Sequence, residues 1–207
     1  MKLQNLLEHR RSVRLFSDKK SIPPDDIEDC LRQATLAPTS SNMQLWQFIH
    51  LVDSSWRDGL TKACLGQKAA STATQWVVFV TRQDFFQSRA KFLLNFEILN
   101  IKRNNLKDKQ TKRIAHRKVY YGKLMPLLYA RFFRLLGIMR KLIVLIMGIF
   151  RPVVREVSET EIRTVVHKSC ALAAQTFMLA MAEKGYDTCP MEGFDSKMVK
   201  KLSLIHI

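Results

Sequence analysis

One stretch near the C-terminal end constrains the fold most, because its apolar residues recur at helical spacing between Ser158 and Gly185. Ser158 and Glu161 match a capping box, in which each side chain binds a free amide at the start of a helix. Gly185 is typical of the residue that ends a helix. The pattern predicts a helix of about 26 residues and about 39 Å, which is long for a small domain.

Shorter patterns predict further helices and two strands. Residues Lys2–Arg10 form an amphipathic segment, and the prolines and acids of Ser21–Asp26 are typical of a first helical turn. This second helix should end before Pro38. The β-branched and aromatic runs Trp46–Val52 and Gln75–Thr81 predict strands. Because the chain has 207 residues, we expect a single domain over residues 1–207.

The positive charge of the chain is concentrated in one segment. The formal net charge is +16, and residues 101–155 contain 15 Lys or Arg against one acid, Asp108. The rest of the chain carries 19 bases against 17 acids. A uniformly basic nucleic-acid-binding protein would not have this distribution, so we do not expect nucleic acid as a partner.

Cysteine usage and the N-terminal sequence indicate the compartment. The four cysteines form no C-x-x-C pair, which argues against a zinc site and favours reduced thiols. The first residues, MKLQNLLEHRR, contain too few consecutive apolar residues for a secretory signal. We therefore expect a cytoplasmic protein, with attachment to the membrane surface as an option.

Two segments have the composition of a ligand site. Arg10, Arg11, Ser12 and Arg14 follow the first helix, and guanidinium groups at this density bind phosphate well. The second segment, Pro38 to Phe48, offers hydroxyl and amide groups suited to the edges of an aromatic heterocycle. Taken alone, the first segment also fits a solvated basic turn, and the second fits a turn with a helix cap.

Together with a third segment, these motifs resemble the nitroreductase family. The family's R-x-S-x-R/K-x-F motif matches Arg10 to Phe16, and its P-x-S-x-N-x-Q-x-W-x-F motif matches Pro38 to Phe48. The third match begins at Ala173 in the long helix and ends in the turn Cys189–Phe194. The resemblance covers roughly residues 1–100 and 156–200.

The resemblance implies an α+β fold, in which a central, mainly antiparallel sheet is flanked by helices. It also implies a homodimer with two FMN sites at its interface. FMN would take hydride from NAD(P)H at its N5 atom and pass it to a small electrophile such as a nitroaromatic or a quinone, with no protein side chain as acid, base or nucleophile. The rival interpretation is a non-enzymatic, basic membrane-surface protein that retains a flavin-binding fold.

The family's functional residues can be carried over to four groups of positions. The first group would bind the FMN phosphate, and the second, from the partner subunit, would contact the ring system. The third is a glutamine at the pyrimidine edge, and the fourth is a turn whose amides at Glu192 and Gly193 would reach flavin N5 and O4. In this order the residues are Arg10, Arg11, Ser12 and Arg14; Pro38, Thr39, Ser40 and Asn42; Gln67; and Pro190, Met191, Glu192 and Gly193.

The chain departs from the family in two places. Family members continue beyond this turn into a C-terminal arm, which we expect to be missing here after about residue 201. The second departure is residues 101–155, a basic and apolar insertion that we expect to be helical. Its longest uncharged run, Leu142–Phe150, would form a helix of about 14 Å, which is too short to span a bilayer of about 30 Å.

Three roles for the insertion remain open: a lid over the flavin, an added dimer surface, or a helix on an anionic membrane through residues 124–150. On a continuous helix Lys123, Arg131, Arg134 and Lys141 would share an arc of about 80°, as an interfacial helix requires.

Overall fold

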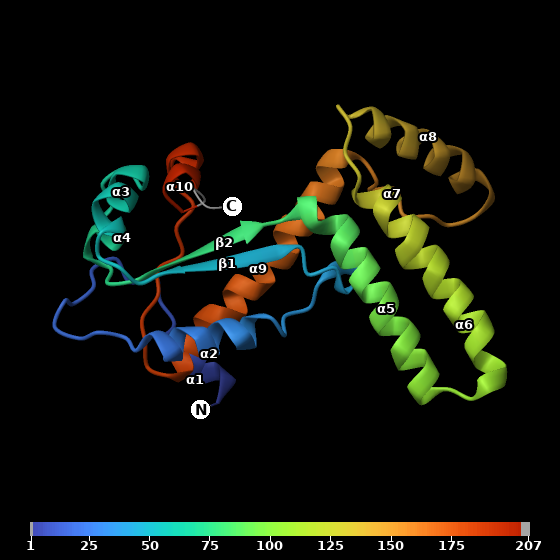
Figure 1. Cartoon of the computed structure of the whole chain (residues 1–207). Coiled ribbons are helices and arrows are strands. Elements are labelled where there is room, and N and C mark those ends of the chain that lie inside the picture. Colours follow the sequence, from blue (N-terminus) through green and yellow to red (C-terminus); the bar gives the residue numbers. More distant parts are fainter. Residues whose placement is uncertain (1, 204–207) are drawn as a thin grey trace. The chain divides into compact units, whose positions relative to one another are not determined.

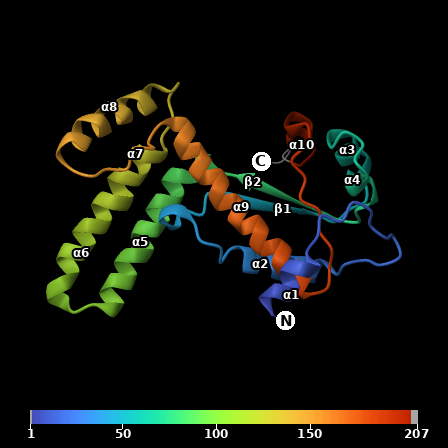
Figure 2. The same cartoon turned by 180° about the vertical axis from the view of Figure 1, so that it is seen from behind.

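The computed structural model describes residues 2–203, whose contacts group into two compact units. Unit 1 comprises Met1–Ala37, Gln47–Val80 and Leu172–Ile207, and unit 2 comprises Pro38–Trp46 and Thr81–Ala171. Figures 1 and 2 show their elements from opposite sides. The single domain over residues 1–207 stays a prediction, and residues 204–207 of the chain's end lie outside the described residues.

Unit 1 contains the two predicted strands and most of the short helices. Arg82 N donates to Leu45 O at 2.9 Å where the strands leave the sheet, and the pairing of the strands is antiparallel. Both strands and the first two helices are thus confirmed within one residue or two of their predicted ends. The elements are α1 (Leu3–His9), α2 (Pro24–Ala34), β1 (Trp46–Leu51), α3 (Trp56–Ala63), α4 (Lys68–Thr72), β2 (Trp76–Thr81) and α10 (Ser196–Ser203).

The core of unit 1 lies between the sheet, α2 and the second half of the long helix α9 (Glu159–Glu183). From α2, Ile27 and Cys30 are buried, and from α9, Phe177 is buried against them. The rings of Phe48 and Phe79 complete this cluster from the two strands. The apolar periodicity of α2 and α9 therefore marks the faces that these helices bury.

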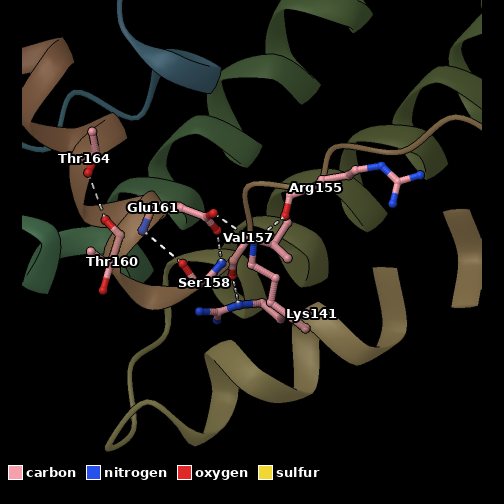
Figure 3. A network of polar contacts seen from close by, with 8 residues as sticks. Lys141, Arg155, Val157, Ser158, Thr160, Glu161 and Thr164 are labelled. Atoms are coloured by element: carbon pink, nitrogen blue, oxygen red, sulfur yellow. Dashed lines mark hydrogen bonds and ion pairs between the residues drawn. The ribbon is translucent and has the colours of Figure 1, made fainter. Parts of the chain in front are cut away.

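Helix α9 begins and ends as its sequence predicts. The Ser158 amide donates to Glu161 Oε2 at 2.8 Å, and the Glu161 amide donates to Ser158 Oγ at 3.2 Å, so the capping box is confirmed (Figure 3). Hydrogen bonds from Lys141 and from Ser158 lower the pKa of the Glu161 carboxyl to about 2, so this carboxylate stays charged at neutral pH. Gly185 has a left-handed φ of 80°, which ends the helix.

Unit 2 is built from helices around a second core. Both views show α5 and α6 as an antiparallel pair, with α7 continuing the line of α6 (Figures 1 and 2). The buried residues of this core include Leu93, Tyr121, Tyr129 and, from the first half of α9, Ile162. The elements are α5 (Phe86–Asn104), α6 (Lys107–Val119), a π-helical segment (Tyr120–Leu124), α7 (Met125–Tyr129) and α8 (Leu135–Phe150), with 3₁₀ turns at Ser40–Asn42 and Gln83–Phe85.

Residues 101–155 are largely helical, but the predicted arc of basic residues is wrong. Lys123 lies in the π-helical segment, whereas Arg131 and Arg134 lie in the turn between α7 and α8. Phe133 and Arg134 in this turn have φ values of 44° and 66°, which break the helix. Lys141 belongs to the separate helix α8, so the four cations share no helical face.

Length and composition alone single out α9, among the helices of residues 2–203, as able to cross a bilayer. Core helices of globular proteins pass the same test. Helix α9 contributes buried side chains to the cores of both units, including Val166 and Phe177.

Candidate functional site

The arginine-rich segment, Arg10 to Arg14, lies beside Thr188, which directly precedes the turn Cys189–Phe194. Helix α1 ends where the Arg10 amide donates to Leu6 O at 2.9 Å, and the chain then becomes extended. Ser12 pairs with Thr188 in a parallel bridge, and the Val13 amide donates to Thr188 O at 3.2 Å. The arginine-rich segment therefore pairs, within unit 1, with a residue that lies two positions before the turn Pro190–Gly193.

The guanidinium groups of this segment are not equivalent. Arg11 Nη1 donates to Leu7 O at 2.8 Å and to Arg10 O at 3.0 Å, so it caps the C-terminal end of α1. Within residues 2–203, the side chains of Arg10 and Arg14 make no hydrogen bond or salt bridge, which leaves both groups available to an anion.

The turn Pro190–Gly193 presents free backbone donors. Within the described part of the chain, the amides of Glu192 and Gly193 have no hydrogen-bond partner, and both residues are exposed. The Asp195 carboxylate accepts bonds from the Lys197 and Met198 amides, at 2.8 and 3.1 Å, and so holds the start of α10 directly after the turn.

Gln67 and the turn are in direct contact. Gln67 Nε2 donates to Gly193 O at 2.8 Å, and a Cβ at position 193 would lie 3.2 Å from the same nitrogen. Gln67 therefore contacts the turn from its position immediately before α4. At the other end of α4, Thr72 Oγ1 accepts a bond from the Phe16 amide at 3.0 Å. Helix α4 thus joins the end of the arginine-rich motif to the turn.

The predicted ring-binding loop, Pro38–Asn42, lies in unit 2. Thr39 Oγ1 accepts a bond from the Gln44 amide at 3.0 Å, and the Ser40 amide donates to Ser169 Oγ at 3.4 Å. Ser41 and Asn42 have φ values of 53° and 54°, a conformation that costs free energy in residues other than glycine. Such a loop keeps its shape only when its surroundings hold it.

Two tyrosines from residues 101–155 hold this loop, and sequence reasoning missed both. The Tyr120 hydroxyl bonds to Ser41 Oγ at 2.8 Å, and the Tyr121 hydroxyl donates to Ser41 O at 3.0 Å. Tyr121 is buried, and this burial raises the pKa of its hydroxyl, which therefore stays protonated as a donor. The adjacent aromatic pair Tyr120–Tyr121 was the available signal, although aromatic pairs are also common in cores.

The four cysteines are free thiols, of which three are buried and one is partly exposed. Cys30, Cys64 and Cys170 are buried, and burial raises the pKa of the Cys170 thiol to about 11, which makes it inert at neutral pH. Cys189 is partly exposed beside the turn.

Comparisons with known proteins agree with the three motifs. The model of the nitroreductase family matches residues 7–205. MhqN of Bacillus subtilis (strain 168), a protein named for NAD(P)H nitroreductase activity, is 22% identical over 198 residues, which are 96% of this chain and 79% of that protein.

Solved structures show the same fold. A nitroreductase family protein from Streptococcus pneumoniae superimposes with a TM-score of 0.65 at 20% identity, covering 97% of this chain and 82% of that one. A nitroreductase from Exiguobacterium sibiricum, solved in complex with FMN, superimposes with a TM-score of 0.63 at 18% identity. The match covers 98% of this chain and 80% of that one. Since the family model spans nearly the whole sequence and three ordered motifs agree with it, this chain belongs to the nitroreductase family.

Proposed function

We propose that the chain is an FMN-dependent oxidoreductase that uses NAD(P)H to reduce a small electrophile such as a nitroaromatic or a quinone. The pairing of Ser12 with Thr188 is the observation that carries the proposal. Because Thr188 lies two residues before the turn Pro190–Gly193, this pairing supports a single ligand that contacts both the arginine-rich segment and the turn.

The groups present at this site fit FMN. Two guanidinium groups that have no partner among residues 2–203, those of Arg10 and Arg14, suit the phosphate dianion, since charge-assisted bonds of this kind are strong. The free amides of Glu192 and Gly193 suit the N5 and O4 atoms of the ring. When bound, FMN supplies the two-electron chemistry, while the chain's residues bind and orient the ring.

The ring-binding loop supports a homodimer. In the family the loop corresponding to Pro38–Asn42 reaches the flavin of the partner subunit, and here it belongs to a different unit from the other site residues. We propose that two copies of the chain complete two FMN sites, and that the protein is cytoplasmic.

Reconstitution tests this function directly. After incubation with FMN and gel filtration, the protein is expected to retain a flavin absorbance spectrum and to oxidise NADH or NADPH in the presence of a quinone. A parallel sample without FMN is the control. Retained flavin with no oxidation of either nucleotide would favour the non-enzymatic alternative, and absence of flavin binding would contradict both.

The phosphate site gives a sharper prediction. Replacing Arg14 with alanine should weaken FMN binding by about 1.5–3 kcal/mol, the usual contribution of a charge-assisted hydrogen bond. Riboflavin has no phosphate, so its affinity should hardly change. Lys20→Ala, which removes one exposed cation from the same unit, is the matched control. Flavin fluorescence quenching measures the affinities of the wild type and of both variants for FMN and for riboflavin. Equal losses for FMN and riboflavin would contradict a phosphate role for Arg14.

A further inference from the structure

Helix α8 exposes its large apolar side chains and turns its small and charged residues toward the protein. A helix on the surface of a water-soluble domain has the opposite arrangement. Leu142 is 57% exposed, Ile146 60% and Ile149 75%. The exposed apolar residues of this helix are Leu135, Ile138, Met139, Leu142, Ile143, Leu145, Ile146, Ile149 and Phe150.

The two cations of α8 are directed inward. Arg140 is 5% exposed, and its guanidinium donates to Val157 O at 2.8 Å, to Leu127 O at 2.8 Å and to Ala130 O at 3.0 Å. Arg140 and Lys141 are the helix's own charges, and each binds groups on the inner side of α8.

Lys141 and Gly137 complete the inner side. Lys141 Nζ donates to Arg155 O at 2.9 Å and to Glu161 Oε1 at 2.8 Å, as the dashed lines in Figure 3 show. At Gly137 an added Cβ would lie 2.9 Å from the Glu159 amide nitrogen, so the backbone of α8 packs closely on the start of α9. Helix α8 is thus held to unit 2 and is poorly suited to opening and closing as a lid.

The ends of the apolar surface are lined with cations and aromatic rings. Before α8, Phe132 is 56% exposed and Phe133 is 87% exposed, beside the exposed residues Arg131 and Arg134. Arg151 is exposed at the other end. Within residues 2–203 none of these three arginines forms a salt bridge. Aromatic and apolar groups bordered by Arg suit the boundary between lipid headgroups and acyl chains.

We propose that α8 and the adjoining residues Phe132 and Phe133 insert into the interfacial layer of an anionic lipid membrane. With 16 residues α8 is about 24 Å long, shorter than the hydrocarbon core of about 30 Å, so the helix lies in the membrane surface. Apolar burial stabilises this insertion, and attraction between the cations and anionic headgroups adds to it.

Charge favours a membrane over a second copy of the chain as the occupant. Each copy carries 15 Lys or Arg against one acid in residues 101–155, so pairing two α8 surfaces would bring like charges together. An anionic membrane attracts the same segment.

The test compares Ile146→Trp with Leu106→Trp, a matched probe at a 71% exposed apolar position away from α8. Each protein is mixed with vesicles of phosphatidylglycerol and phosphatidylcholine. The fluorescence of the Ile146→Trp protein should shift to the blue and be quenched by brominated acyl chains, with little change for Leu106→Trp. Phosphatidylcholine alone should give little binding, and raising the salt to about 1 M should release the protein, since the Debye length falls to about 3 Å.

A second pair of variants separates apolar insertion from charge attraction. Leu142→Gln with Ile146→Gln keeps the net charge and should weaken vesicle co-sedimentation at least about tenfold, because two apolar side chains that would insert into the membrane are lost. Phe96→Gln with Leu99→Gln makes the same change on the exposed surface of α5 and should leave binding unchanged. Equal binding by all variants would overturn the proposal. The proposal would also be overturned if the protein did not bind vesicles and instead formed a dimer, measured by light scattering, that Leu142→Gln with Ile146→Gln disrupts.

Discussion

Replacing Arg140 with methionine is expected to lower the free energy of unfolding by about 2–4 kcal/mol. The guanidinium is buried and satisfies the carbonyls of Leu127, Ala130 and Val157, and a methionine would leave them without a donor. An unsatisfied buried acceptor costs about 1–3 kcal/mol, and water can replace the donor at the more exposed carbonyls. Chemical denaturation measures the loss.

The neighbouring cation provides the control. Lys141→Met removes an ion pair with Glu161 whose side chains are 43% and 35% exposed, so it should cost about 0.5 kcal/mol. Similar losses in the free energy of unfolding for the two variants would contradict the conclusion that Arg140 is the residue that holds α8 to unit 2.

Truncating Phe177 to alanine is expected to destabilise unit 1 by about 3–5 kcal/mol, through lost apolar burial and the cavity left behind. Phe177 is 6% exposed, and its ring lies 5.5 Å from that of Phe79, which in turn contacts Phe48. The readout is the shift in the urea unfolding transition. Phe92→Ala, at a 59% exposed position on α5, should stay within about 0.5 kcal/mol of the wild type. An effect at Phe177 no larger than that at Phe92 would contradict this core assignment.

Local sequence signals predicted most helices and strands correctly, because their causes act over a few residues. Ser158 and Glu161 cap α9 through bonds between neighbours, and Gly185 ends it through its own backbone conformation. Prolines and acids begin α2 in the same way. Such signals do not depend on what the helix later packs against.

For residues 101–155, the prediction of a shared basic face failed because it assumed one continuous helix. The wheel that placed Lys123 and Lys141 on a common arc required regular geometry from residue 123 to 141, but a π-helical segment and a left-handed turn interrupt it. Tertiary packing decides such interruptions, since Tyr121 within the π-helical segment and Tyr129 at the end of α7 are buried in the core of unit 2.

For the candidate site, too, the sequence predicted the local segments but not the contacts between them. Motifs identified the arginine-rich segment, the loop Pro38–Asn42 and the turn Pro190–Gly193, because each is a short run with distinctive chemistry. The pairing of Ser12 with Thr188, and the bonds from Tyr120 and Tyr121 to Ser41, join residues that are far apart in the chain. No local pattern encodes these contacts.

By itself, the sequence determined the family, the capped central helix and the segment that carries nearly all the excess charge. Only the tertiary structure decided which residues of α8 face the protein. Arg140 and Lys141 would both have been assigned to solvent from their charge, yet on the inner side Arg140 donates to the carbonyl of Val157 and Lys141 donates to the Glu161 carboxylate. Because a charged side chain turns inward wherever enough partners compensate for its lost hydration, the large apolar residues of α8 remain outside.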